Sequence, residues 1–312
     1  MKNDIKKRRI DVSVILVNYN TKKITEAAIK SIIEYTSNIS YEIILVDNAS
    51  EDGSVEYLKE IFKDKIIIIE NKVNFGFGKA NNQGIKLARG KYLFLMNTDI
   101  LLLDNSIKLM YEYMERNNQV GVCGGNLLNI NLKENHSFRK RLPNIWNELK
   151  VYDFLYEKIL GIKNDFNYKT EPVEVGYITG ADMFIRTSVL REVGNFDEDF
   201  FMYSEETELT YRITKAGYKV ISLPKVRMIH LAGASSSNNI KKFGMIMSSK
   251  YLYYYKVFGK KSLKKLYVIY SIKLVLKFIM TFDKFNLICM KVNKEEYLKM
   301  KKKYFKGEKC IL

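Results

Sequence analysis

The first hundred residues alternate between short apolar runs and segments with helical spacing. Four apolar runs predict buried strands, at residues 12–17, 42–46, 65–69 and 92–96. The apolar positions between them recur every three to four residues and predict helices, at residues 21–35, 54–62 and 78–88. Strands that are apolar throughout are typical of a parallel sheet with helices on both faces. We therefore expect an α/β fold whose crossovers are right-handed.

The pattern continues less regularly up to residue 230. It predicts a helix at 105–116 with Asp104 as its N-cap, and a strand at 119–123. Residues 131–170 are polar, and we interpret them as an insertion or lid. From Glu174 onward, a strand is followed by four further predicted elements, which are helices at 187–193 and 205–216 and strands at 219–222 and 226–229. The rest of the chain is expected to be helical.

The composition is that of a folded chain, with 47% hydrophobic and 28% charged residues among 312. The three cysteines, Cys123, Cys289 and Cys310, show no paired spacing. This argues against a disulfide framework or a zinc ribbon and favours a reducing, cytoplasmic setting. The basic N-terminus precedes an apolar run of only six residues, which is too short for the core of a signal peptide.

The net charge of +17 is concentrated at the C-terminal end. Residues 240–312 hold nineteen lysines against three glutamates and one aspartate, whereas residues 1–239 hold 33 basic and 31 acidic residues. We therefore expect residues 239–312 to form a separate basic, helical region.

Hydrogen-bonding side chains follow each of the four predicted strands. They are Asn18-Tyr19-Asn20, Asp47-Asn48-Ala49-Ser50, Glu70-Asn71 and Asn97-Thr98-Asp99. In open parallel sheets, ligands bind at the carboxyl ends of the strands. One such ending is ordinary turn chemistry, because Asn and Asp favour turns. Four on one edge predict a site for a polar ligand.

Three positions have both a chemical and a purely structural interpretation. Asp99 fits a Mg²⁺ or Mn²⁺ site, but it also fits a cap on the next segment. His230 is suited to ligate a divalent ion or to serve as a structural residue. Glu205 and Glu206 suit a general base, and they equally suit the first turn of a helix, where acidic residues complement the dipole.

The loop NFGFGKANNQG, residues 74–84, nearly matches the dinucleotide fingerprint G-x-G-x-x-G, with Asn81 in place of the third glycine. That fingerprint belongs on the first turn between strand and helix, whereas this loop follows the third strand. The position of the loop therefore argues against a dinucleotide fingerprint, and its glycines are expected to let the backbone pass close to a bound ligand.

Taken together, these motifs resemble those of inverting glycosyltransferases of family 2, which have the GT-A fold. The resemblance runs from residue 12 to residue 230 and rests on VSVILVNYNT, EIILVDNASEDGS, NFGFGKANNQG, the NTD after the fourth strand, the stretch from GYITGADMF to ITKAGYKV, and His230. The branch it resembles contains the rhamnosyltransferase-like enzymes that build bacterial surface polysaccharide. The resemblance implies a Rossmann-like, mostly parallel sheet flanked by helices in residues 1–238, with the nucleotide-sugar half at about 1–103 and the acceptor half at about 104–238.

The resemblance also implies roles for individual residues. Binding of a UDP- or dTDP-sugar falls to Val17, Asn18, Tyr19, Asn20, Asp47, Asn48, Gly76, Lys79, Asn97, Thr98, Gly180 and Ala181. Asp47 would bond the pyrimidine or ribose, and Gly180 and Ala181 would floor the donor-sugar pocket. Asn97 and Asp99 fall on the family's D-x-D metal motif. Because Asn97 replaces its first Asp, we expect Asp99 and His230 to be the direct ligands of Mg²⁺ or Mn²⁺.

Glu205 and Glu206 fall on the family's Glu-Asp pair, whose second member is the catalytic base. The resemblance therefore implies Glu206 as the base, with a side chain one methylene longer than the family's Asp. The implied reaction is a single displacement, with inversion, onto a hydroxyl of a saccharide or a lipid-linked acceptor.

Residues 266–282 are too few, and too charged at Lys273 and Lys277, to predict a spanning helix. Lys284 and Lys291 continue the lysine face at seven-residue steps, which is typical of a helix in the interface of an anionic membrane. This would place the protein on the inner face of the cell membrane. Packing against the rest of the chain, or against a second subunit in a dimer, would explain the same pattern.

Other functions fit the sequence less well. A processive polysaccharide synthase would need a Q-x-x-R-W motif and several spanning helices, and a nucleotidyltransferase would need a glycine-rich loop where the chain has NYNTKK. Nucleic-acid binding is not expected, because the basic region has no arginine and no recognition motif. A non-catalytic binding protein or scaffold that uses the lysine-rich region is the remaining alternative.

Overall fold

The computed structural model describes residues 10–148, 165–231 and 239–305. The predicted alternation of the first hundred residues is confirmed. Its elements are β1 (Val12–Asn18), α1 (Lys22–Tyr35), β2 (Tyr41–Asp47), α2 (Ser54–Phe62), the 3₁₀ turn η1 (Lys63–Lys65), β3 (Ile67–Glu70), α3 (Phe77–Leu87) and β4 (Tyr92–Met96). The third strand begins two residues later than predicted, because η1 occupies its expected start.

The second part of the chain adds strands to the same sheet and ends in three long helices. Its elements are β5 (Ile100–Leu102), α4 (Ser106–Arg116), β6 (Val120–Leu128), β7 (Phe138–Arg139), α5 (Ile145–Glu148), β8 (Val173–Glu174), β9 (Tyr177–Ile178), β10 (Asp182–Arg186), α7 (Thr187–Val193), α8 (Glu205–Lys215), β11 (Lys219–His230), α9 (Asn239–Phe258), α10 (Lys260–Thr281) and α11 (Lys284–Tyr304).

One mixed sheet forms the centre of the fold, with the strand order β3-β2-β1-β4-β10-β6-β11-β5. Strands β1 to β4 are mutually parallel, as predicted, and β6 and β11 are parallel to each other. The central strand β10 runs antiparallel to both β4 and β6, and β5 runs antiparallel to β11. The mostly parallel sheet is therefore confirmed, with β10 joining its two halves.

Two local predictions were wrong. The strands predicted at 219–222 and 226–229 are one strand, β11, whose pairing with β6 shifts register between Leu223 and Arg227. The predicted N-cap of α4, Asp104, lies one residue too early, because the helix has Asn105 in that position. The Asp104 carboxylate instead accepts a hydrogen bond from the Ser106 hydroxyl at 2.6 Å.

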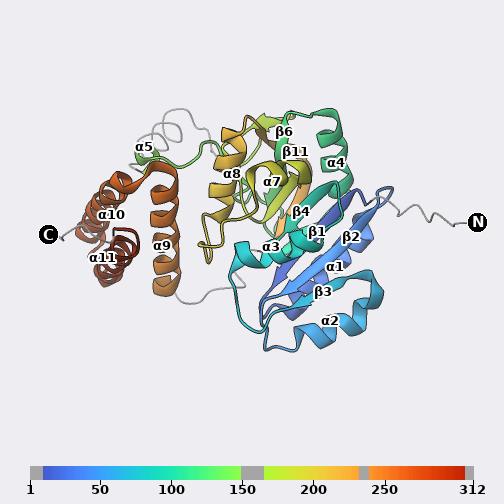
Figure 1. Cartoon of the computed structure of the whole chain (residues 1–312), viewed down its shortest axis with the longest axis horizontal. Coiled ribbons are helices and arrows are strands. Elements are labelled where there is room, and N and C mark those ends of the chain that lie inside the picture. Colours follow the sequence, from blue (N-terminus) through green and yellow to red (C-terminus); the bar gives the residue numbers. More distant parts are fainter. Residues whose placement is uncertain (1–9, 149–164, 232–238, 306–312) are drawn as a thin grey trace, which may run out of the picture.

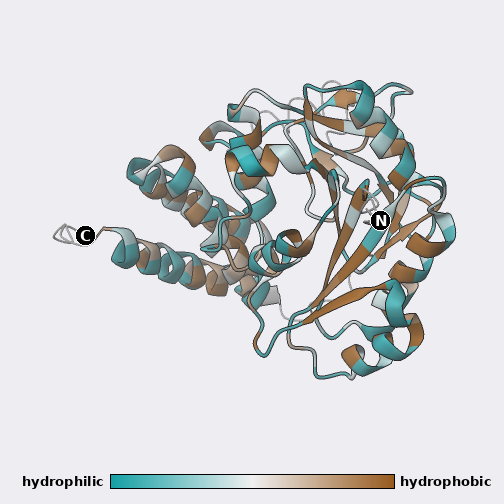
Figure 2. Cartoon of the chain, turned by 45° about the vertical axis from the view of Figure 1, so that its right-hand side comes forward, coloured by the Kyte–Doolittle hydropathy of each residue, from teal (hydrophilic) through white to brown (hydrophobic). Residues whose placement is uncertain are grey.

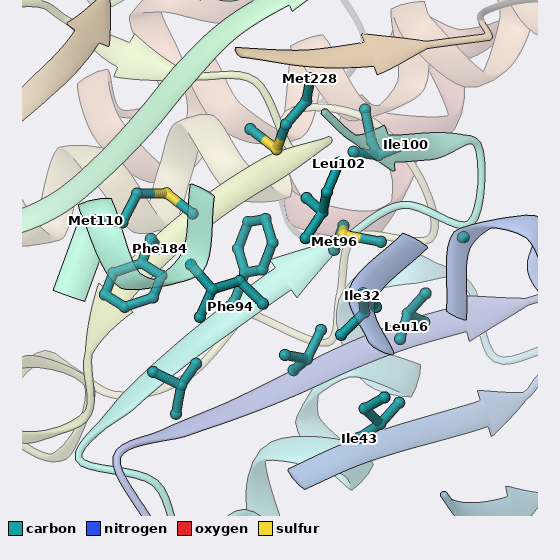
Figure 3. Close-up of a cluster of buried hydrophobic side chains, with 14 of the residues drawn as sticks. Leu16, Ile32, Ile43, Phe94, Met96, Ile100, Leu102, Met110, Phe184 and Met228 are labelled. Carbon is teal, nitrogen blue, oxygen red and sulfur yellow. The ribbon is translucent and has the colours of Figure 1, made fainter. Parts of the chain in front are cut away.

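Helices cover both faces of the sheet (Figure 1). Buried side chains of α1, α2 and α4 pack on one face in a cluster that includes Leu16, Ile32, Phe94, Met110 and Phe184, shown in Figure 3. Side chains of α3, α7 and α8 pack on the other face. Figure 2 shows that the strands are largely hydrophobic, as expected for a sheet buried on both sides. The sheet is therefore packed between two layers of helices.

Helices α9, α10 and α11 form a bundle at one end of the molecule (Figure 1). Its core contains the fully buried Tyr251, Leu263 and Leu266, and it also encloses Phe200 from the loop before α8. α9 packs directly against α8. None of the helices in the described ranges has the length and apolar content needed to span a bilayer.

The bundle also holds α5, which belongs to the predicted polar insertion. The buried carboxylate of Glu148 lies 2.9 Å from the Lys250 ammonium and accepts a hydrogen bond from Tyr270 at 2.8 Å. The Tyr253 hydroxyl donates to the Pro143 carbonyl at 3.2 Å. The part of the insertion that the structure describes at 143–148 is thus docked on α9 and α10. Residues 149–164 of the predicted insertion lie outside the described residues.

Candidate active site

A buried hydrogen-bond network joins the ends of β1 and β2. The Asn18 amide donates to the Asp47 carboxylate at 2.7 Å and to Ser50 at 3.0 Å. Its carbonyl oxygen accepts from the hydroxyls of Thr21 and Thr25, each at 2.7 Å. The amide nitrogen and the carbonyl oxygen of Asn18 are thus both engaged within this network, so its side chain fixes the position of Asp47.

A second network joins the end of β2 to the glycine loop. The Asn48 amide donates to Asn74 at 2.8 Å and to the Gly76 carbonyl at 3.2 Å, and its oxygen accepts from the Phe75 amide at 3.0 Å. The hydrogen bonds of the Asn48 side chain therefore hold the glycine loop against the end of the sheet.

The remaining residues of this end are more exposed. Val17 is in β1, Tyr19 is half exposed, and Asn20 adopts a left-handed conformation in which its side-chain oxygen accepts from the Glu51 amide. Lys79 lies over the ring of Phe75 and pairs with Glu198 at 3.5 Å. The structure therefore directs Lys79 to Glu198, and its contact with a donor stays a prediction.

The glycine loop contacts the loop before α8 at close range. Gly76 has φ +83°, and a Cβ at this position would lie 2.1 Å from the Phe201 carbonyl oxygen. The next amide, that of Phe77, donates to the same carbonyl at 2.8 Å. Only glycine permits both this conformation and this approach.

The end of β4 lies between these groups and the start of β10. The Asn97 amide donates to the Ala181 carbonyl at 2.9 Å, and the hydroxyls of Thr98 and Thr21 are 3.3 Å apart. A Cβ on Gly180 would lie 3.6 Å from the Cβ of Glu206. Residues from β1, β4, β10 and α8 thus meet at one edge of the sheet.

Pairing of β5 with β11 brings Asp99 and His230 together. His230 pairs with Ile100, and the Leu231 amide donates to the Asp99 carbonyl at 2.9 Å. The His230 Nε2 atom lies 3.4 Å from Asp99 Oδ2, and each side chain is 20% exposed. These two side chains, 131 positions apart in the sequence, therefore present a nitrogen and an oxygen donor to the same partly open space.

The two carboxylates at the start of α8 have different environments. Glu205 is 3% exposed, and its Oε2 atom has no hydrogen-bond partner within the described residues. Burial and the neighbouring Glu206 raise the pKa of Glu205 to about 8. Burial also raises the pKa of Glu206, which is partly exposed and accepts from the Thr207 hydroxyl at 3.2 Å. A carboxylate with a raised pKa is a stronger base, which suits proton abstraction near neutral pH.

The loop that leads into α8 is strained and is held by the C-terminal bundle. Tyr203 and Ser204 have φ values of +72° and +64°, which non-glycine residues seldom adopt. Ser249 of α9 donates to the Met202 carbonyl at 2.6 Å, and Lys256 forms ion pairs with Asp197 and Asp199. Ser204 occupies the N-cap position, but its side chain makes no capping hydrogen bond.

Sequence reasoning missed several residues around this site. Tyr177 lies in β9, which packs against α8, and burial together with the charge of Glu206 raises its pKa to about 12. Asn135 donates to the His230 carbonyl at 3.4 Å, and burial together with Arg139 lowers the pKa of the adjacent His136 to about 4. Tyr177 stands in the GYITGAD stretch, but no periodicity or spacing marks it as a neighbour of Glu206.

Comparisons with known proteins agree with this architecture. The model of glycosyl transferase family 2 matches residues 13–194, which is more than half of the chain. The chain therefore belongs to glycosyl transferase family 2. It is 31% identical over 155 residues to an uncharacterized glycosyltransferase of Methanocaldococcus jannaschii, covering 46% of this chain and 51% of that one.

A further relative is the low-salt glycan biosynthesis hexosyltransferase Agl10 of Haloferax volcanii, which is 26% identical over 225 residues, or 70% of this chain and 67% of the relative. An uncharacterized glycosyltransferase of Haemophilus influenzae is 28% identical over 66% of this chain and 61% of its own. The chain spans about half to two thirds of the length of these relatives.

Two solved structures share the fold. One is a mannosyltransferase of Pyrobaculum calidifontis in complex with GDP-Man and Mn²⁺, with a TM-score of 0.57 and 15% identity over 96% of this chain and 89% of that one. The other is GalNAc-T7 with UDP, GalNAc and Mn²⁺, with a TM-score of 0.62 and 18% identity over 96% and 57%. The expected GT-A-like sheet flanked by helices is thus confirmed, together with a C-terminal helical extension.

Proposed function

We propose that this protein is an inverting glycosyltransferase that moves a sugar from a UDP- or dTDP-sugar to a hydroxyl of a saccharide or lipid-linked acceptor. The observation that carries the proposal is the meeting of four groups at one sheet edge. They are the Asn18–Asp47 network, the Asp99–His230 pair, the Gly180–Ala181 turn and the Glu205–Glu206 pair. Membership of family 2 and the named hexosyltransferase relative support the reaction class.

In this proposal, Asp47 binds the nucleoside and Asn18 holds Asp47 in place. Asn48 fixes the glycine loop, so that the backbone near Gly76 forms the wall beside the base. The two structural neighbours contain a nucleotide or nucleotide sugar, which supports this donor class. In this proposal, the outer boundary of the donor site is formed by Val17, Tyr19, Asn20 and Lys79.

Asp99 and His230 fit a divalent cation as part of its donor set. Their facing Oδ2 and Nε2 atoms suit Mn²⁺, and also Mg²⁺ if oxygen ligands supply the rest. Within the described residues, no group of three His, Cys, Asp or Glu side chains could hold a metal. The diphosphate and water would therefore complete the coordination. When bound, the cation would neutralise charge that develops on the leaving diphosphate.

Glu206 acts as the general base. The acceptor oxygen bonds to the anomeric carbon, the bond from that carbon to the diphosphate oxygen breaks, and the acceptor proton passes to the Glu206 carboxylate. Burial raises the pKa of Glu206, and the charge of Glu206 in turn helps to raise the pKa of buried Glu205. Gly180 leaves room beside Glu206 for the donor sugar.

The narrower parts of the proposal concern the sugar and the place of the reaction. We propose rhamnose as a candidate sugar and cell-surface polysaccharide synthesis as the process, at the inner face of the cell membrane. The catalytic unit would comprise residues 1–238 and the helical extension residues 239–312. Relatives named for poly-β-1,6-N-acetyl-D-glucosamine synthesis and for glucosylation of poly(ribitol phosphate) support a role in glycan synthesis.

The Glu206→Gln variant tests the role of the base. It should keep donor binding, measured by titration with UDP or dTDP, while transfer falls by about 10²–10⁴-fold because the amide cannot take up the proton. Glu60→Gln is the matched control, because Glu60 is an exposed glutamate on α2 and is not part of the proposed site. Normal turnover by Glu206→Gln would remove Glu206 from the mechanism.

A further inference from the structure

An apolar surface is formed by exposed side chains of α10 and the start of α11. Nine large apolar side chains between residues 268 and 288 are at least 40% exposed, namely Val268, Ile272, Val275, Leu276, Ile279, Met280, Phe282, Leu287 and Ile288. Those on α10 follow steps of three and four residues, so they share one helix face. Single exposed apolar residues are normal, but a contiguous set of this size marks an interaction surface.

This surface is not needed to hold the bundle together. The opposite side of α10 and α11 supplies buried contacts through Leu263, Leu266, Leu274, Cys289 and Met300. Within residues 266–282, which the sequence predicted as an interfacial helix, Leu274 is buried and Lys273 lies over the Tyr270 ring. Leu274 and Lys273 are therefore not part of the free face, which continues past the turn between α10 and α11 to Ile288.

Two side chains of this apolar surface are more exposed than the others. Met280 is 82% exposed and Phe282 is 78% exposed, which are the two highest values among the exposed large hydrophobic residues of the described chain. Both lie where α10 ends and α11 begins. Side chains in such a position can enter a lipid layer without any change in the fold.

Lysines border this apolar surface. Lys277, Lys284, Lys291 and Lys294 are exposed on the same two helices. The whole region from residue 240 holds nineteen lysines against four acidic residues. A second copy of the chain would bring an equally positive surface to the contact, whereas an anionic bilayer offers complementary charge together with an apolar interior.

We infer that the apolar surface of α10 and the α10–α11 turn docks on an anionic lipid bilayer, with Met280 and Phe282 inserted among the headgroups and the lysines beside lipid phosphates. This deepens the membrane location proposed above by naming the surface that makes the contact. The same bundle holds the loop before α8 through Ser249 and Lys256. A docked bundle therefore carries Glu206 with it to a surface where lipid-linked acceptors are presented.

Flotation of the full chain with vesicles tests the inference without any donor or acceptor, so its outcome is separate from that of the glycosyl-transfer proposal. Vesicles of phosphatidylcholine with about 30% phosphatidylglycerol should bind the protein, and pure phosphatidylcholine vesicles should bind it at least tenfold more weakly. Neutralising Lys277 and Lys284 with Gln should weaken binding by about 25-fold at low salt, because one lysine near an anionic surface contributes about fivefold. Lys86→Gln with Lys225→Gln is the matched control.

The double change Met280→Ser, Phe282→Ser should lower the partition coefficient at least tenfold and leave the unfolding midpoint unchanged, since both side chains are exposed. Ile130→Ser with Leu132→Ser, which are 71% and 56% exposed elsewhere on the surface, should bind like the unmodified protein. Equal vesicle binding by the Met280–Phe282 variant would overturn the inference. So would dimerisation that this variant abolishes, or salt-sensitive DNA binding tighter than vesicle binding.

Discussion

Gly76 allows a sharp test of how the glycine loop and the loop before α8 fit together. Its backbone has φ +83° and ψ 177°, a conformation that is almost restricted to glycine. A Cβ would lie 2.1 Å from the Phe201 carbonyl oxygen and 2.8 Å from its carbonyl carbon. Gly76→Ala therefore adds two penalties, one from the backbone conformation and one from the contact.

A second glycine separates these penalties. Gly259 has φ +77° and ψ −179°, nearly the same conformation, but a Cβ there would meet nothing within 4 Å. Gly259→Ala should therefore cost only the backbone term, about 1–3 kcal/mol. In Gly76→Ala, the Phe201 carbonyl must also retreat by about 1 Å and lose its hydrogen bond from Phe77, which contributes about 0.5–1.5 kcal/mol.

We expect Gly76→Ala to be destabilised by at least about 1 kcal/mol more than Gly259→Ala, which corresponds to a melting temperature lower by roughly 2–4 °C. Urea and thermal unfolding followed by circular dichroism measure both variants. Gly76→Ala should also lose transfer, because the displaced Phe201 lies in the loop that leads to Glu206. Equal midpoints for the two variants, or full transfer by Gly76→Ala, would show that the close contact is not rigid and would refute the reasoning.

Three further predictions concern the site. Asp99→Asn should raise the Mn²⁺ concentration needed for half-maximal transfer at least about tenfold. Asp64→Asn, at an exposed position, is the control. Full activity of the unmodified protein in EDTA would contradict the metal assignment. Because the pKa of Glu205 is raised to about 8, this side chain stays neutral in the folded protein while it ionises in the unfolded chain, so stability falls as pH rises from the ordinary carboxyl pKa to about 8. The melting temperature of Glu205→Gln should therefore rise relative to that of the unmodified protein across this window. A pH-independent difference would argue against a neutral Glu205. Lys256→Met removes the ion pairs to Asp197 and Asp199, so it should lower kcat without changing the donor KM and should speed amide hydrogen exchange at residues 197–204. Lys299→Met, which removes an ion pair to Glu296, is the control and should change neither. Unchanged exchange in Lys256→Met would show that Lys256 does not position this loop.

The parallel half of the fold was predictable because each of its strands is a continuous apolar run of at least four residues. β5 was not, because its three residues, Ile100–Leu102, follow directly on the polar Asn97–Asp99 and carry no period of their own. The central strand β10 also escaped precise prediction. Its antiparallel direction depends on the pairing of Phe184 with Phe94 across the sheet, which is a tertiary fact.

The candidate site, like the fold, could be predicted from the sequence only in part. The polar strand ends at Asn18 and Asp47 could be placed on one edge of the sheet from topology alone. The pairing of Asp99 with His230 was suggested only by family resemblance, since it depends on β5 pairing with β11. The burial of Glu205 and the ion pairs of Lys256 with the loop before α8 were not predictable. Both depend on packing between segments that are distant in the sequence.

The ion pair between Glu148 and Lys250 limits how this chain can be recombined with others. Its Glu148 carboxylate is buried, and the pair joins segments about a hundred positions apart. Removing one partner of such a pair leaves an uncompensated charge and costs about 3–5 kcal/mol. A chimera that takes its last helices from another enzyme would therefore have to take the matching segment around α5 as well. In this chain, the segment around α5 and the C-terminal helices must therefore be exchanged together, although they are far apart in the sequence.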